Sequence, residues 1–222
     1  MQRRYGNCAR VESLRARGEA TRQGEMNMPI TYTNRKGFTY YLCQGITKTG
    51  KARYYFAREP KDEPVKQVPS GYQIDESVNG IVSLVKARPR LVLPQELVSV
   101  ESALKKHPKG RNYRVAIKHD QIVIYEGLGP DLKSLSAIFG AEMIRQPEIA
   151  GRLQVEMDRY TQYTPVMRFI LEDAEGRIFV AQRWCYRGSI DDWIYAGHSG
   201  KIEVLAKKLV PKLGTDDFYE LY

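Results

Sequence analysis

The sequence is poor in the residues that build covalent or metal-based sites. Of its 222 residues, three are cysteine and three are histidine. The cysteines lie far apart, without a C-x-x-C spacing: Cys8, Cys43 and Cys185. Free thiols in a reducing compartment are the simplest interpretation, which predicts a cytoplasmic protein. No His or Cys spacing is typical of a zinc site, so we expect neither a metal nor another cofactor.

Long apolar runs are also missing. No stretch approaches the roughly 20 apolar residues that a membrane-spanning helix needs, so no membrane partner is expected. Residues 1–29 lack the apolar segment of a secretion signal, and their richness in Arg, Glu and Gly predicts a disordered tail. The whole chain is 42% hydrophobic, which is enough for a folded core.

Acidic residues are absent from residues 30–58. The six basic residues of this stretch are Arg35, Lys36, Lys48, Lys51, Arg53 and Arg58. Its seven aromatic residues are Tyr32, Phe38, Tyr40, Tyr41, Tyr54, Tyr55 and Phe56. Cations interleaved with rings favour a polyanion that also offers flat faces for stacking, and nucleic acid is the obvious candidate.

The net charge of +9 is unevenly distributed along the chain. Residues 91–222 carry 18 basic and 18 acidic side chains, so the whole excess lies in residues 1–90. Such asymmetry is informative about partners rather than about fold. It strengthens the prediction that the N-terminal part meets a polyanion.

Alternating patterns predict four antiparallel strands, in two hairpins, over residues 30–88. Residues 38–44 and 52–58 alternate in hydrophobicity around a turn, and Asn79-Gly80 is a strong signal for a second hairpin. Residues 89–94 resemble a linker. The fold class is therefore expected to be α+β: a small antiparallel four-stranded N-terminal β module followed by a C-terminal α+β domain of hairpins and helices over residues 95–222.

Within the C-terminal domain, hairpins and helices are expected in turn. The predicted hairpins pair residues 111–118 with 121–126 and residues 166–172 with 177–186. The predicted helices cover residues 95–107, 131–139, 147–160, 189–195 and 201–213, with a short turn from Asp216.

A near match to a nucleotide-binding loop begins at Gly45. The run from Gly45 to Lys51 fits G-x-x-x-x-G-K, but Ala52 replaces the hydroxyl residue that would hold Mg²⁺. The following residues favour a strand, whereas a phosphate-binding loop must open a helix. A hairpin tip that carries Lys48 and Lys51 is the better interpretation.

The same hairpin offers the best candidate binding surface. If Phe38, Tyr40, Leu42, Tyr54 and Phe56 point inward, Tyr41, Arg53 and Tyr55 share the outer face. We expect the cations to contact phosphates and the tyrosines to stack on bases. The full predicted set is Arg35, Lys36, Tyr41, Lys48, Lys51, Arg53, Tyr55 and Arg58. The alternative is that these rings only build the small core or pack on the second domain.

A second candidate site lies between residues 184 and 193, which include both tryptophans, Trp184 and Trp193. Asp191 and Asp192 could hold Mg²⁺ in a phosphodiesterase. The competing interpretation is a helix start, with Ser189 capping and Asp192 in the first turn.

The leading hypothesis is a non-catalytic nucleic-acid-binding protein (DNA or RNA) whose C-terminal domain forms a homo-oligomer or contacts another protein. Two alternatives stay open: a metal-dependent phosphodiesterase or nuclease-like enzyme that uses Asp191 and Asp192, and a protein-interaction or structural component without a nucleic-acid role.

Overall fold

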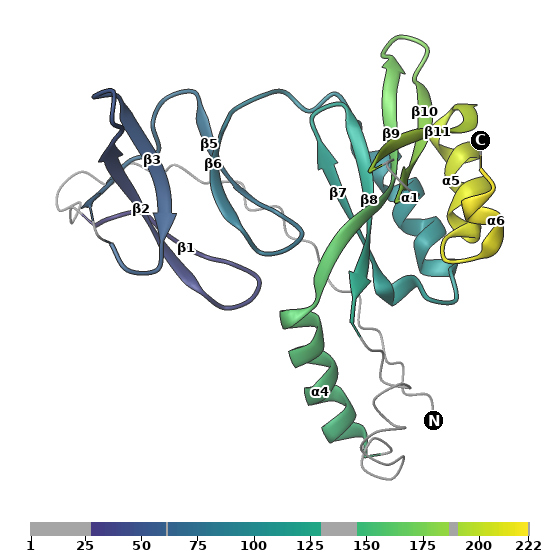
Figure 1. Cartoon of the computed structure of the whole chain (residues 1–222), viewed down its shortest axis with the longest axis horizontal. Coiled ribbons are helices and arrows are strands. Elements are labelled where there is room, and N and C mark those ends of the chain that lie inside the picture. Colours follow the sequence, from purple (N-terminus) through teal and green to yellow (C-terminus); the bar gives the residue numbers. More distant parts are fainter. Residues whose placement is uncertain (1–27, 61, 130–145, 187–190, 222) are drawn as a thin grey trace, which may run out of the picture.

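The computed structural model describes residues 28–60, 62–129, 146–186 and 191–221. The protein is α+β, as expected, with antiparallel sheets and helices, and the N-terminal part holds a four-stranded sheet. The two-stranded hairpin β5–β6 lies between this small sheet and a five-stranded sheet, and helices α1, α5 and α6 cover the far side of the larger sheet (Figure 1). None of the described helices is long and apolar enough to cross a membrane.

The N-terminal sheet is built around the longest of its strands, β2. Its strands are β1 (Thr31–Thr33), β2 (Thr39–Ile46), β3 (Ala52–Ala57) and β4 (Glu63–Pro64). The predicted β2–β3 hairpin is confirmed, with Gly50 at φ +79° in its turn. The short strands β1 and β4 both pair with β2 and were not predicted.

The second predicted hairpin, β5 (Tyr72–Glu76) with β6 (Val82–Lys86), is also confirmed. Gly80 in its turn adopts φ +73°, which glycine accommodates without strain. However, this hairpin forms a separate two-stranded sheet, so the two predicted hairpins belong to different sheets.

The C-terminal part is a five-stranded antiparallel sheet in the order β11-β10-β9-β8-β7. Its strands are β7 (Tyr113–Lys118), β8 (Gln121–Leu128), β9 (Gln162–Asp173), β10 (Ile178–Cys185) and β11 (Asp192–Gly200). The helices are α1 (Pro94–Lys106), α4 (Pro147–Tyr160), α5 (Ile202–Leu209) and α6 (Asp216–Tyr219), with single 3₁₀ turns at Gly110–Asn112 and Val210–Lys212.

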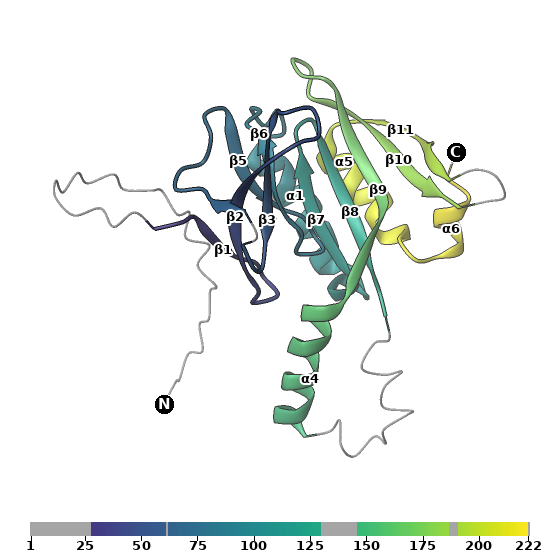
Figure 2. The same ribbon diagram turned by 60° about the vertical axis from the view of Figure 1, so that its left-hand side comes forward.

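One face of the large sheet carries the main core. Phe169 and Phe179 are fully buried there, against Val100 of α1 and Leu209 of α5. The opposite face has a smaller cluster, in which Val78 from the β5–β6 turn packs on the sheet. Helix α4 has no buried residue and projects away from the sheet (Figure 2).

The predicted helix over residues 189–195 is wrong. Asp192 begins strand β11, which pairs along β10 and places Trp193 opposite Trp184. The Ser-x-x-Asp spacing resembles a helix start. However, β-branched and aromatic residues favour a strand, and Trp193, Ile194 and Tyr195 pair with the edge of β10. Ser189 and the predicted helix over residues 131–139 lie outside the described residues.

Candidate nucleic-acid interface

The tip of the β2–β3 hairpin carries two exposed lysines, Lys48 and Lys51. The turn beneath them is held by backbone bonds from Thr47 N to Lys51 O (2.8 Å) and from Gly50 N to Thr47 O (2.9 Å). Neither lysine side chain has an ion-pair partner among the residues that the structure describes. Strand β3 follows directly, so this segment opens a strand and not the helix that a nucleotide-binding loop requires, as the sequence predicted.

Tyr41, Arg53 and Tyr55 share one face of the hairpin, as expected. Tyr41 lies opposite Ala57, and Tyr55 lies opposite Cys43. The guanidinium carbon of Arg53 lies 5.8 Å from the centre of the Tyr55 ring. This face therefore combines one cation with two half-buried rings.

A carboxylate that the sequence pattern did not reveal reaches this face. The Tyr55 hydroxyl donates a hydrogen bond of 2.5 Å to Asp62 Oδ2. This bond is the main reason that the pKa of Tyr55 is raised to about 12. Asp62 lies outside the acid-free stretch, but the chain folds back so that β4 pairs with β2. The bond fixes the orientation of the Tyr55 ring.

Arg58 belongs to the opposite face of the hairpin. Its guanidinium carbon lies 3.9 Å from the centre of the Phe38 ring and 5.9 Å from that of Tyr40. A guanidinium in this position is attracted by the negative faces of the rings. Arg58 is therefore not part of the surface that Tyr41 and Tyr55 form.

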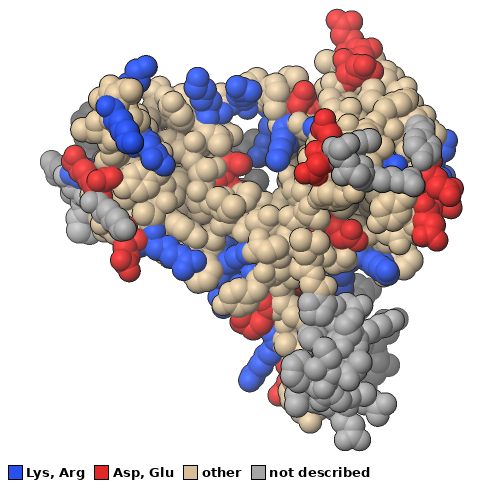
Figure 3. All heavy atoms as spheres, viewed as in Figure 1, with Lys and Arg blue, Asp and Glu red and all other residues tan. Residues whose placement is uncertain are grey.

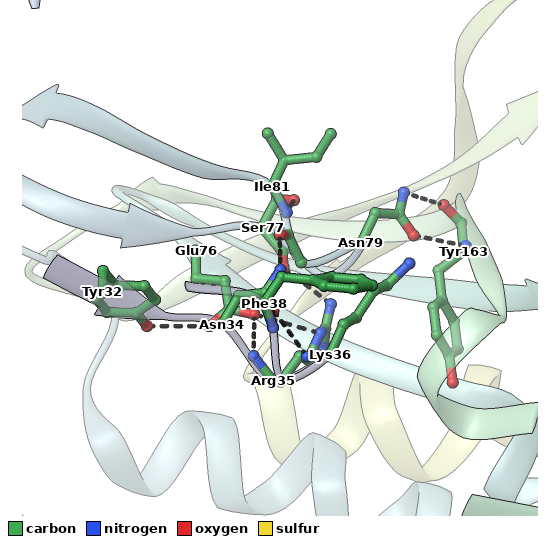
Figure 4. A network of polar contacts seen from close by, with 11 residues as sticks. Tyr32, Asn34, Arg35, Lys36, Phe38, Glu76, Ser77, Asn79, Ile81 and Tyr163 are labelled. Carbon is green, nitrogen blue, oxygen red and sulfur yellow. Dashed lines mark hydrogen bonds and ion pairs between the residues drawn. The ribbon is translucent and has the colours of Figure 1, made fainter. Parts of the chain in front are cut away.

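Arg35 and Lys36 lie in the turn between β1 and β2, at the junction of the N-terminal sheet with the rest of the protein. Arg35 pairs with Glu76 (Nε to Oε1, 3.7 Å) and donates from Nη2 to the Ser77 carbonyl at 2.8 Å (Figure 4). The Lys36 side chain passes beside Gly80, where an added Cβ would lie 3.1 Å from Lys36 Cγ. The structure thus separates these two residues from the hairpin tip.

Two asparagines fix this junction. The buried Asn34 donates to the Gly80 carbonyl at 2.6 Å. The Asn79 side chain donates to the Tyr163 carbonyl at 3.0 Å and accepts from Tyr163 N at 2.7 Å (Figure 4). It thus makes with β9 the same two hydrogen bonds that the backbone of an adjacent strand would make. The β5–β6 turn therefore ties the N-terminal sheet to the five-stranded sheet.

Sequence reasoning missed a second basic surface, which we call the linker groove. It has a volume of about 450 Å³ and lies between β5–β6 and the β7–β8 turn. Its charged or titratable residues are Asp75, Lys86, Arg88, Arg90, Lys118 and His119. The sequence does contain three basic residues at alternate positions, Lys86, Arg88 and Arg90. Their charge was overlooked because the acidic residues between positions 61 and 90 nearly cancel it in the net charge of that segment.

The two aspartates of the alternative enzyme site each engage a tryptophan. Asp191 Oδ1 accepts from Trp184 Nε1 at 3.1 Å, and Asp192 Oδ1 accepts from the Trp193 backbone N–H at 2.7 Å. The two indole rings meet edge to face, 5.0 Å apart. Within the described ranges, no group of three or more His, Cys, Asp or Glu side chains is arranged to hold a metal ion.

The two described cysteines and His107 lie in the packed part of the fold. Cys43 and Cys185 are free and buried, and burial is the main cause that raises the pKa of the Cys43 thiol. Lys109 N donates to His107 Nδ1 at 3.1 Å, and His107 Nε2 lies 3.1 Å from the Leu213 carbonyl. The candidate interface consists of the hairpin tip, the adjoining face of Tyr41, Arg53 and Tyr55, and the linker groove.

In comparisons with known proteins, no family, no curated protein and no solved structure matches this chain.

Proposed function

We propose that the protein binds nucleic acid without catalysing a reaction on it, and that the β2–β3 hairpin makes the contact. The observation that supports this most strongly is the set of exposed cations Lys48, Lys51 and Arg53, none of which has an ion pair within the described part of the chain. Unpaired cations on one small hairpin are available for phosphates.

The cations and tyrosine rings of the hairpin complement the phosphates and bases of a nucleic-acid strand. Each phosphate that a cation neutralises releases counterions, so the affinity depends steeply on salt. Tyr41 and Tyr55 lie on the same face as Arg53, and stacking of a base on such a ring contributes about 1–3 kcal/mol. Because the bond to Asp62 orients Tyr55, less side-chain freedom is lost when a base stacks on it.

The test replaces Lys48, Lys51 and Arg53 with Gln together, here called the hairpin variant. A control variant, Lys106→Gln with Lys207→Gln and Lys208→Gln, removes the same charge from exposed positions of α1 and α5. Fluorescence anisotropy of labelled oligonucleotides is measured over a series of salt concentrations. We expect the hairpin variant to bind more weakly, and the slope of log K against log salt to fall by about one unit for each phosphate that the variant no longer neutralises.

The control variant separates contact from net charge. If the control variant binds as weakly as the hairpin variant, general electrostatic attraction accounts for binding and the hairpin has no special role. Native protein that binds no nucleic acid at low salt refutes the proposed function altogether.

A further inference from the structure

We infer that the linker groove holds the sugar–phosphate backbone of an unpaired nucleic-acid strand, an inference that rests on the proposed function and names its substrate class. The groove is separate from the hairpin tip, since it is lined by β5, β6, the segment after β6 and the β7–β8 turn. Figure 3 shows blue Lys and Arg atoms beside the hollow between the N-terminal and C-terminal parts.

The charge of the groove is strongly positive. Lys86, Arg88 and Arg90 are exposed and have no ion pair or hydrogen bond from their side chains among the described residues, and Lys118 joins them from the other wall. Asp75 is the carboxylate among the lining residues. Four cations against one anion, at close spacing, make a concave surface that attracts phosphates more strongly than isolated surface lysines do.

The backbone that carries these cations is fixed on both sides. Ala87 N donates to the Gly71 carbonyl at 2.8 Å, so the segment leaves β6 in a defined direction. His119 Nδ1 donates to the Pro89 carbonyl at 2.9 Å, and Leu91 N donates to the His119 carbonyl at 2.9 Å. Arg88 and Arg90 therefore flank an anchored proline.

The end of this segment is also anchored. Val92 is buried in the main core, and Arg177 Nη2 donates to the Leu91 carbonyl at 3.1 Å. Arg177 is itself paired with the buried Glu96 of α1. A site whose backbone is already ordered loses little conformational entropy when a ligand binds, which favours a binding site over a passive connection.

The shape of the groove favours a single strand. Its volume of about 450 Å³ lies in the range of pockets that enclose small ligands, roughly 300–1,000 Å³. The flexible backbone of one strand can follow such a small concave surface, whereas a duplex holds its phosphates on the outside of a thick rod. Val85 and Ile117 add apolar wall surface that suits sugars or base faces.

The experiment compares single-stranded and double-stranded probes on the full chain. The groove variant carries Lys86→Gln, Arg88→Gln and Arg90→Gln, and it is compared with the hairpin and control variants by anisotropy with labelled oligothymidylate and a labelled duplex of equal length. We expect the groove variant to lose at least about tenfold in affinity for the single strand, with a smaller salt slope, and less than about threefold for the duplex.

A charge-retaining variant guards against misfolding as the cause. Lys86→Arg with Arg88→Lys and Arg90→Lys keeps every positive charge and should bind oligothymidylate within about threefold of the native protein. Equal losses of affinity for single strand and duplex, or native affinity in the groove variant, overturn this inference while the proposed function stands. If the native protein binds neither probe at low salt, the proposed function itself is refuted, and the inference about the groove is refuted with it.

Discussion

The N-terminal sheet and the five-stranded sheet differ chiefly in how they are held together. In the β1–β4 sheet, the buried hydrophobic residues are Leu42 and Cys43. The main core of the five-stranded sheet contains 20 buried residues, from its strands and from the helices behind them. A unit as small as the N-terminal sheet buries too little surface to be stable alone, so it depends on contacts with its neighbours.

The proposed contact residues of the β2–β3 hairpin therefore lie apart from the main core. The hairpin tip and residues 86–90 lie in the part of the chain with few buried side chains, whereas the other wall of the linker groove belongs to the five-stranded sheet. Cations that have no ion pair among the described residues repel one another, which destabilises the N-terminal part. The asparagine contacts at the β5–β6 turn connect it to the well-packed sheet. Substitutions in the two regions should affect different properties.

The strongest effect should come from the main core. Phe179→Ala removes a fully buried ring, so the free energy of unfolding should fall by about 3–5 kcal/mol. Phe56→Ala, at a half-buried position of the N-terminal sheet, should cost about half as much. Urea unfolding followed by circular dichroism measures both. Equal decreases in the two variants would contradict the contrast between the two sheets.

A weaker effect is expected at the junction. Asn79→Ala removes both hydrogen bonds to Tyr163, which should cost about 1–3 kcal/mol. Amide hydrogen exchange should become faster in β5–β6 and in the β1–β2 turn, and stay slow in β8 and β9. Thr215→Ala, which removes a single exposed bond at the start of α6, serves as the control. Uniformly faster exchange across the chain would show that the two parts unfold as one unit.

The weakest effect concerns Tyr55. Its pKa of about 12 exceeds the usual 10, so the stabilising bond to Asp62 is fully present below pH 10 and is lost as the pH rises through 12. An ultraviolet titration should contain a late-ionising tyrosine that disappears in Tyr55→Phe. Removal of a tyrosine that ionises near pH 10 instead would show that the bond to Asp62 does not form in solution.

Local patterns predicted most of the strands and helices. The Asn79-Gly80 turn and the alternation around Thr47–Lys51 identified both N-terminal hairpins, because turn chemistry and alternation are short-range properties. Strand β11 was missed because its residues form a strand through their pairing with β10. Rules based on neighbouring residues in the sequence do not include such a contact.

The candidate site was predicted only in part, for a similar reason. The sequence placed Tyr41, Arg53 and Tyr55 on one face, because side chains alternate along a strand. It could not show that Asp62 returns to Tyr55, or that Arg58 lies over Phe38, since both contacts depend on how the chain folds back. The linker groove depends on β5–β6 and the β7–β8 turn together, so composition alone could not reveal it.

The bonds between Asn79 and Tyr163 join residues that are 84 positions apart in the chain. During synthesis, the N-terminal sheet and the β5–β6 hairpin therefore leave the ribosome long before the strand to which they dock exists. Their basic side chains are exposed throughout this interval, since contacts of high sequence separation form late. The N-terminal sheet is thus anchored by this contact only after Tyr163 has been made.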